Sequence, residues 1–343
     1  MHTSISSQDF GDLIEEWEAV RTRVGALDLR STGRLRVTGK DRVRFLHNML
    51  SNDIRNLASG SGCHALLLSR QGHVEADLWV YVHDNEIWLE CPSACARQLF
   101  ETLSRFIVAD AVTIEDLAER VGILSLQGPQ AAATVARTLG APFESLPLFS
   151  HKTYERPSGL WTLVCRDRSG CGGYDLWLPS RDLDAVWRNW IEAECIQSVG
   201  YPALNIVRTE AGIPWYGQDV DDRSLPMEVG LGDAISMAKG CYRGQEIVAR
   251  VTHRGHLDRG LGGIAIEAEV IPPAGAGVFA GETQAGKVTS AVISPMLGRA
   301  LALAILRRES AAPGTTVDVA CGDARQRGMV VSLPLHSPRI ERG

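Results

Sequence analysis

One octapeptide, Lys239-Gly240-Cys241-Tyr242-Arg243-Gly244-Gln245-Glu246, combines a thiol, two cations and two glycines. In an extended backbone alternate side chains share a face, so Lys239, Cys241 and Arg243 would lie together. Two cations beside a thiol stabilise the thiolate and lower the pKa of the thiol. The segment therefore predicts a reactive or anion-binding cysteine loop. A tight turn before a helix, with a cysteine that only packs, fits the same residues equally well.

The two glycines and the residues that follow restrict the backbone of this loop. Gly240 and Gly244 make a helix costly within the octapeptide and let the backbone approach a ligand closely. Directly afterwards Ile247, Val248 and Val251 are spaced for one helical face. The pattern predicts a loop that leads into a helix.

The other seven cysteines, at positions 63, 91, 95, 165, 171, 195 and 321, form no Cys-x-x-Cys pair. Cys91 and Cys95 are four residues apart, which matches the spacing of structural zinc sites poorly. We therefore expect free thiols rather than disulfides, no bound metal and no resident iron–sulfur cluster.

The length of 343 residues and the net charge of −6 limit the class of protein. The length predicts two or three domains. The negative charge argues against a general affinity for nucleic acid or anionic membranes. The first eleven residues are polar, and the apolar run at 300–306 is too short to cross a bilayer. We expect a cytoplasmic protein with neither a nucleic acid nor a membrane as partner.

Helices and strands must position these side chains, and their patterns alternate in the first part of the chain. Apolar spacing predicts helices at 13–24, 41–50, 94–106 and 182–192 and in the alanine-rich run that ends at 139. Apolar runs bounded by turn residues predict strands at 34–38, 63–69, 74–82, 86–90, 121–126, 161–165 and 175–178.

After residue 256 the pattern changes to short, β-rich segments separated by glycine and proline. Such a series is typical of a small all-β barrel or sandwich. The sequence thus predicts an α+β region at 1–256 and a separate C-terminal β-barrel domain at 257–343.

The octapeptide, followed by Val248-Ala249-Arg250, resembles the signature of the YgfZ family, which belongs with the glycine-cleavage T-proteins (aminomethyltransferases). Weaker similarity to T-protein motifs covers nearly the whole chain. It is carried by Ser51-Asn52-Asp53-Ile54, Leu126-Gln127-Gly128-Pro129, Glu210-Ala211-Gly212-Ile213-Pro214, Tyr216-Gly217-Gln218-Asp219 and Ser294-Pro295-x-Leu297-Gly298.

This resemblance implies a three-lobed ring, with two interleaved α+β lobes and a C-terminal β-barrel, that holds tetrahydrofolate in a central channel. The pterin ring of folate presents adjacent donors that suit a carboxylate, and its flat rings suit apolar or aromatic walls. Asp77 falls where T-proteins have an aspartate near the reactive folate nitrogens. Asp175 falls where they have a glutamate that contacts the pterin.

Three further residues in the matching motifs, Tyr174, Arg243 and Glu210, are expected folate contacts on the same ground. Other interpretations stay open for the carboxylates. Asp77 would otherwise be a solvent-facing strand residue, and Asp175 has a shorter side chain than the glutamate it replaces.

The chain also departs from the T-protein pattern. Thr32 stands where T-proteins have a histidine, and Leu204 stands where they have an arginine. These departures favour the YgfZ-like function over aminomethyl transfer from a lipoyl carrier.

Three functions follow. The first is a tetrahydrofolate-binding accessory protein for iron–sulfur cluster assembly or repair. In that function Cys241 and Lys239 would perform the redox or transfer chemistry, with iron–sulfur client proteins as transient partners. The second, an enzyme, is a tetrahydrofolate-dependent aminomethyl- or methyltransferase in which Asp77 orients the folate amine. The third is a folate sensor or scaffold in which Cys241 packs structurally.

Overall fold

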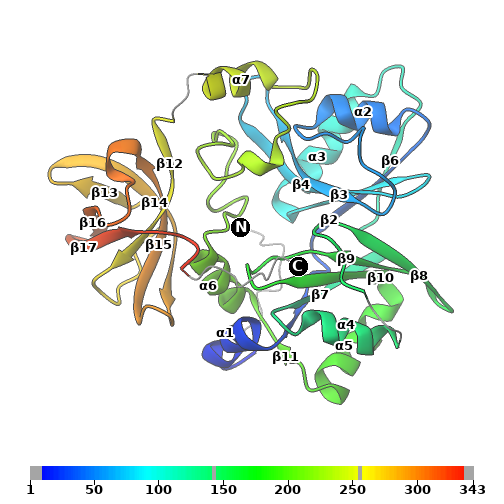
Figure 1. Cartoon of the computed structure of the whole chain (residues 1–343), viewed down its shortest axis with the longest axis horizontal. Helices are drawn as coiled ribbons and strands as arrows, with labels where there is room; N and C mark the ends of the chain where they lie inside the picture. The colour runs from blue at the N-terminus through cyan, green and yellow to red at the C-terminus, as the bar shows by residue number, and fades with distance from the viewer. Residues whose placement is uncertain (1–9, 141–143, 254–256, 336–343) are drawn as a thin grey trace.

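The computed structural model describes residues 10–140, 144–253 and 257–335, and Figure 1 shows three lobes arranged around a centre. The first lobe is a five-stranded sheet in the order β3-β4-β5-β2-β6. Its strands are β2 (Gly33–Thr38), β3 (Gly62–Leu68), β4 (Val74–Val82), β5 (Ile87–Cys91) and β6 (Thr113–Asp116). Helix α3 (Ser93–Phe106) packs on this sheet, and α2 (Arg42–Met49) adds Phe45 and Leu46 to the same apolar core.

The second lobe is a six-stranded sheet in the order β11-β1-β7-β10-β9-β8. Its strands are β1 (Gly25–Asp28), β7 (Val121–Gln127), β8 (His151–Arg156), β9 (Gly159–Cys165), β10 (Gly173–Pro179) and β11 (Gln197–Ser198). Helices α4 (Ala131–Leu139) and α5 (Leu183–Arg188) pack on it. The chain enters this sheet with β1, builds the other sheet with β2 to β6, and returns with β7, so the two α+β lobes are interleaved.

The third lobe is a closed barrel in the order β12-β15-β14-β13-β16-β17. Its strands are β12 (Arg259–Ile266), β13 (Gly277–Ala280), β14 (Thr283–Ser294), β15 (Arg299–Arg307), β16 (Thr316–Cys321) and β17 (Ala324–Val331). Valine, isoleucine and alanine side chains fill its interior. The predicted fold class is confirmed, whereas the domain boundary at 256/257 adjoins residues 254–256, outside the described residues, and stays a prediction.

Helix α6 (Tyr201–Ala211) joins the second lobe to the barrel, because it packs against α1 (Leu13–Thr22), which contacts β1 and β11, on one side and against the barrel strands β14 and β15 on the other. Its fully buried Arg208 makes an ion pair with Asp219 and donates to the Ser290 hydroxyl of the barrel at 2.7 Å. The helix ends at Gly212, whose φ of 75° is a left-handed conformation that glycine adopts at little cost. The chain then crosses the centre of the ring and reaches α7 (Gln245–His253).

The octapeptide is not extended, which corrects the expectation that its cations share a face with the thiol. Residues 240–242 belong to no strand; Lys239 and Tyr242 are buried, and Cys241 between them is exposed. The loop follows this course because the Lys239 ammonium turns inward to backbone carbonyls.

In the described part of the chain, no helix is long and apolar enough to span a membrane.

Candidate functional site

A cavity of about 560 Å³, here called the central cavity, lies where the two α+β lobes meet the segment after α6. Strands β3, β4 and β5 supply one wall, and residues 166–168 and 212–218 supply others. Its volume suits a small organic ligand. Its lining combines aromatic side chains (Trp79, Phe149, Tyr201, Trp215 and Tyr216), ionisable ones (His64, Asp77, Glu90, Arg166, Asp167, Arg168 and Asp233) and apolar ones.

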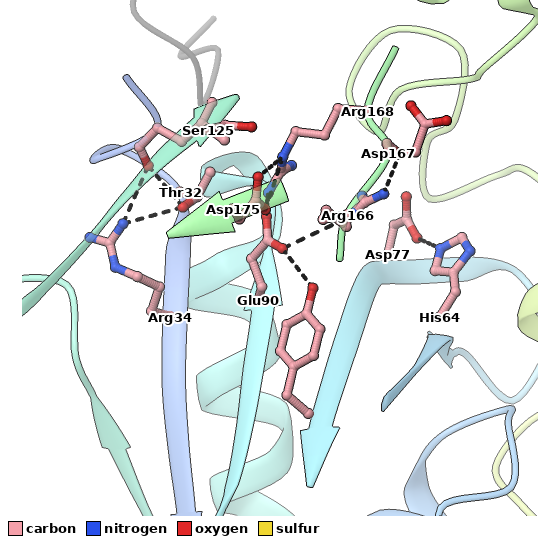
Figure 2. Close-up of polar contacts among 12 residues, drawn as sticks. Thr32, Arg34, His64, Asp77, Glu90, Ser125, Arg166, Asp167, Arg168 and Asp175 are labelled. Atoms are coloured by element: carbon pink, nitrogen blue, oxygen red, sulfur yellow. Dashed lines mark hydrogen bonds and ion pairs between the residues drawn. The ribbon is translucent and has the colours of Figure 1, made fainter. Parts of the chain in front are cut away.

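Asp77 faces this cavity rather than bulk solvent. Its side chain is only 4% exposed, and its Oδ1 atom is hydrogen-bonded to Nε2 of His64. The contact arises from register, because β3 pairs antiparallel with β4 and places His64 opposite Trp79, two residues from Asp77. Figure 2 shows the His64 ring beside the Asp77 carboxylate, joined by a dashed line. Within the described residues, no protein group bonds to the second oxygen of Asp77.

Trp79 holds two other polar groups of the cavity in place. The His64 ring stacks on it with centroids 4.8 Å apart and an interplanar angle of 10°. The Arg166 guanidinium also lies over the indole, 3.6 Å from the ring centroid. Stacking therefore fixes the His64 ring, and cation–π attraction fixes the Arg166 guanidinium, before any ligand binds.

Asp175 is fully buried and is absent from the residues that line the cavity, within the described part of the chain. Both of its oxygens accept hydrogen bonds from Arg168, at 3.2 and 2.6 Å. The same guanidinium donates to Glu90 at 2.5 Å, and Glu90 also accepts from the Tyr81 hydroxyl at 3.3 Å. Figure 2 shows Arg168 between the two carboxylates. Arg168 and Glu90 thus line the cavity at the place where we expected Asp175.

Burial acts on these two carboxylates against the neighbouring cations. Burial raises the pKa of Asp175 above its ordinary value even though Arg168 opposes the shift. Burial also acts to raise the pKa of Glu90, but the charges of Arg168 and Arg166 outweigh it and hold that pKa below its ordinary value. Glu90 is therefore the carboxylate held ionised beside the cavity.

Tyr174 and Glu210 lie in packed regions, away from the cavity lining that the described residues form. Tyr174 packs in the core of the second lobe. Glu210 accepts hydrogen bonds from Trp17 Nε1 at 2.9 Å and from the Ser294 hydroxyl at 2.6 Å. It therefore fastens α6 to both α1 and the barrel, which is a structural task.

The two cations of the octapeptide bind protein groups. The Lys239 ammonium donates to the backbone carbonyls of His47, Leu50 and Asn52 at 2.5, 2.6 and 2.9 Å, where α2 ends. Burial lowers the pKa of Lys239 to about 8. Arg243 makes an ion pair with Glu75 and donates to the Leu68 carbonyl. Cys241 is left exposed on a loop that these two residues anchor.

Several residues of the cavity received no site role from the sequence, among them His64, Glu90, Arg166 and Arg168. His64 is a polar residue inside an otherwise apolar strand, which is a usable signal. Thr32 and Leu204, the two departures from the T-protein pattern, both line the cavity. No cluster of three or more potential metal ligands exists among the residues that the structure describes.

Comparison with known proteins agrees with this architecture. Residues 6–239 match the GCVT N-terminal domain family, and residues 259–336 match the glycine cleavage T-protein C-terminal barrel domain family. The aminomethyltransferases of Geobacillus kaustophilus and Anoxybacillus flavithermus are 32% and 31% identical to this chain. Each match covers 95% of this chain and 91% of the relative. The glycine cleavage system aminomethyltransferase T from Bartonella henselae superposes with a TM-score of 0.87 at 23% identity, over 95% of this chain and 90% of that one. The chain therefore belongs to the glycine-cleavage T-protein (aminomethyltransferase) family.

Proposed function

We propose that this protein binds tetrahydrofolate in the central cavity and transfers a one-carbon unit to or from it, as an aminomethyltransferase. The observation that carries the proposal is Asp77, a cavity-facing carboxylate with one oxygen held by His64 and the other available to a ligand. The family supports the reaction class, because the relatives at 31–32% identity are aminomethyltransferases.

The residues of the cavity fit a folate. Trp215, Tyr216 and Phe149 offer flat apolar surfaces for the rings, and Glu90 and Asp77 offer acceptors for ring and amine N–H groups. Arg166 and Arg168 keep the charge of this wall balanced. Folate would supply the amine nitrogen that carries the one-carbon unit.

Asp77 would act on the proton of that amine. A carboxylate within hydrogen-bond reach holds an N–H group in one orientation and accepts its proton as the nitrogen bonds to the carbon of the donor and the bond from that carbon to its leaving group on the donor breaks. His64 fixes the carboxylate rotamer from the opposite side, so that the free oxygen keeps its direction. The roles of Asp77 as proton acceptor and His64 as positioning residue are part of this proposal.

Titration with tetrahydrofolate, followed by calorimetry or tryptophan fluorescence, tests the proposal. Asp77→Asn removes one charge-assisted contact worth roughly 1.5–3 kcal/mol, so the affinity is expected to fall by about tenfold or more. Asp323→Asn, at an exposed turn of the barrel, is the matched control. Unchanged affinity in a folded Asp77→Asn variant would remove Asp77 from the site. Formation of a one-carbon folate from an aminomethyl donor then tests transfer itself.

A second function, the support of iron–sulfur proteins by a YgfZ-type factor, rests on the exposed Cys241 in its anchored loop. In that function iron–sulfur client proteins would meet the thiol outside the cavity. An aminomethyl-transfer assay and a cellular iron–sulfur enzyme assay of Cys241→Ser separate the two functions, because only the second needs the thiol.

A further inference from the structure

A cavity of about 470 Å³, here called the arginine cavity, lies outside the central cavity, and the two share no lining residue among those that the structure describes. Helix α3, strand β4, the turn after β3 and the octapeptide line it. Three of these segments each supply an arginine: Arg70 from the turn, Arg105 from α3 and Arg243 from the octapeptide. Guanidinium groups that converge from separate segments indicate a site for an anion.

A glycine of the octapeptide brings Arg243 to this cavity. Gly244 has a φ of 84°, and a Cβ atom added there would lie 2.5 Å from the Ser69 carbonyl oxygen, so only glycine lets the two segments approach this closely. The neighbouring Arg243 consequently reaches the Leu68 carbonyl and the Glu75 carboxylate. The octapeptide therefore helps to form the arginine cavity, a role separate from that of its exposed thiol.

The two acidic side chains that line the arginine cavity already bind other groups. Both oxygens of Glu75 accept hydrogen bonds from Arg243. Glu101 accepts one from Arg97 at 2.7 Å. Arg70 and Arg105, in contrast, make no ion pair with any carboxylate of the described residues. The lining thus carries positive charge without a counter-charge, which favours an anionic ligand over a metal cation.

Two buried donors of the same cavity also lack a partner. The Nε atom of Arg243 is buried and makes no hydrogen bond with the described part of the chain. Thr102 of α3 is only 9% exposed, and its hydroxyl likewise makes no hydrogen bond with a described residue. Buried donors without acceptors are costly, so most buried polar groups in folded proteins are paired. A ligand oxygen in the cavity would offer these two donors an acceptor.

We propose that the arginine cavity binds a phosphate group, either as inorganic phosphate or as the phosphate of a small monoester. The exposed Arg70 and Arg105 would bind its outer oxygens, and the Thr102 hydroxyl and the Arg243 Nε would donate to its inner ones. A phosphate suits this set of donors better than a carboxylate, because it carries about two negative charges at neutral pH and presents more acceptor oxygens. The inference goes beyond the proposed one-carbon transfer and does not depend on it.

Calorimetric titration of the full chain with inorganic phosphate, with sodium chloride added to keep the ionic strength constant, tests the proposal. Because two of the three arginines are exposed and screened by salt, we expect a dissociation constant of about 0.1–1 mM. The double variant Arg70→Gln/Arg105→Gln should bind phosphate about tenfold more weakly or worse. Thr102→Val, which keeps the shape of the side chain, should bind it about three- to fivefold more weakly.

Arg97→Gln is the matched control, because Arg97 is a cation of α3 that does not line the cavity. Its affinity for phosphate should equal that of the parent. Absence of phosphate binding by the parent would overturn the proposal, as would binding that survives in the double variant or is lost equally in Arg97→Gln.

Titration with glycerol 3-phosphate distinguishes the two sources of the phosphate group. Tighter binding of this ester than of inorganic phosphate, with the same loss in the double variant, would support a monoester as the ligand of the arginine cavity. The reverse order, again with the loss in the double variant, would support free phosphate.

Discussion

The Arg168 guanidinium lies between Asp175 and the central cavity, and it binds both oxygens of that carboxylate. Asp175, which we expected to contact the pterin, is thus separated from the cavity by Arg168. Arg168 also reaches Glu90, so one cation holds two buried acids from different lobes. This contact couples the shape of the cavity to the packing of the lobes.

Loss of the Asp175 carboxylate should therefore affect stability strongly. Loss of the charge-assisted contact between Asp175 and Arg168 costs roughly 1.5–3 kcal/mol, because Arg168 keeps Glu90 as its other partner. We expect Asp175→Asn to lower the free energy of unfolding by about this amount in urea titrations. Glu101→Gln, which breaks the exposed Arg97–Glu101 pair, should cost less than about 1 kcal/mol. A loss of unfolding free energy of similar size in both variants would show that the contact between Asp175 and Arg168 does not stabilise the fold.

Substitutions at His64 can separate its stacking on Trp79 from its hydrogen bond to Asp77. His64→Phe keeps a ring to stack on Trp79 and loses the hydrogen bond to Asp77. If that bond orients the carboxylate, folate affinity should fall about five- to tenfold, while His64→Gln, which retains a donor, should recover part of it. Calorimetric titration measures both. Parent-like affinity in His64→Phe would show that Asp77 keeps its orientation without His64.

Substitutions at Cys241 and at Lys239 should have different effects on stability. Cys241→Ser changes an exposed side chain, so the midpoint of unfolding and the affinity for folate should stay near those of the parent. Lys239→Met removes the donor to three carbonyls at the end of α2 and should destabilise the protein by about 2–3 kcal/mol. If the YgfZ-type function holds, Cys241→Ser alone should also lose iron–sulfur enzyme activity in cells.

Alkylation of the native protein, read by peptide mass, gives an independent check on the thiols. Cys241 should react quickly, and the buried Cys91, whose pKa is raised chiefly by its hydrogen bond with Cys95 and by burial, should not. Fast labelling of Cys91 under native conditions would show that the first lobe opens readily. Comparison of Cys241 labelling in the parent and in Lys239→Ala shows whether Lys239 acts on the thiol.

His151 should make stability depend on pH below neutrality. Burial, with a smaller contribution from His83, lowers the pKa of His151 to about 3, and the two rings lie 4.2 Å apart where β4 and β8 approach. Between pH 6.5 and 3 the unfolded chain binds a proton that the folded chain excludes, so stability falls as the pH falls. From pH 6.5 to 4.5 the loss from this group should be about 2–3 kcal/mol.

His151→Phe provides the comparison, because other groups also titrate in this range. The difference in unfolding free energy between the parent and this variant should shrink or reverse toward lower pH, in urea titrations at pH 7.0, 5.5 and 4.5. Parallel curves for the two proteins would mean that His151 accepts a proton in the folded state.

The sequence by itself determined much of the local structure and the family. Apolar periodicity and glycine punctuation predicted α1 to α5, most of the longer strands and the change to a barrel after residue 256, because these depend on neighbouring residues. They did not predict α6 or the strands β1, β6, β8 and β11. The motifs indicated the T-protein plan and picked Asp77 as a cavity residue. They also predicted a helix directly after the octapeptide; α7 begins at Gln245 and so includes the last two residues of the octapeptide.

Only the tertiary structure decided where the charged side chains find partners. Lys239 reaches carbonyls about 190 residues away in sequence, and Arg168 reaches Glu90 from another sheet. His64 and Asp77 meet because of a strand register, as do Arg259 and Arg307. The octapeptide pattern suggested cations around a thiol, but a buried ammonium or guanidinium is stabilised by whichever acceptors the fold brings within reach. Those acceptors come from segments that are distant in the sequence. The packing of the lobes, rather than the spacing of residues along the chain, therefore decided which acceptors each cation binds.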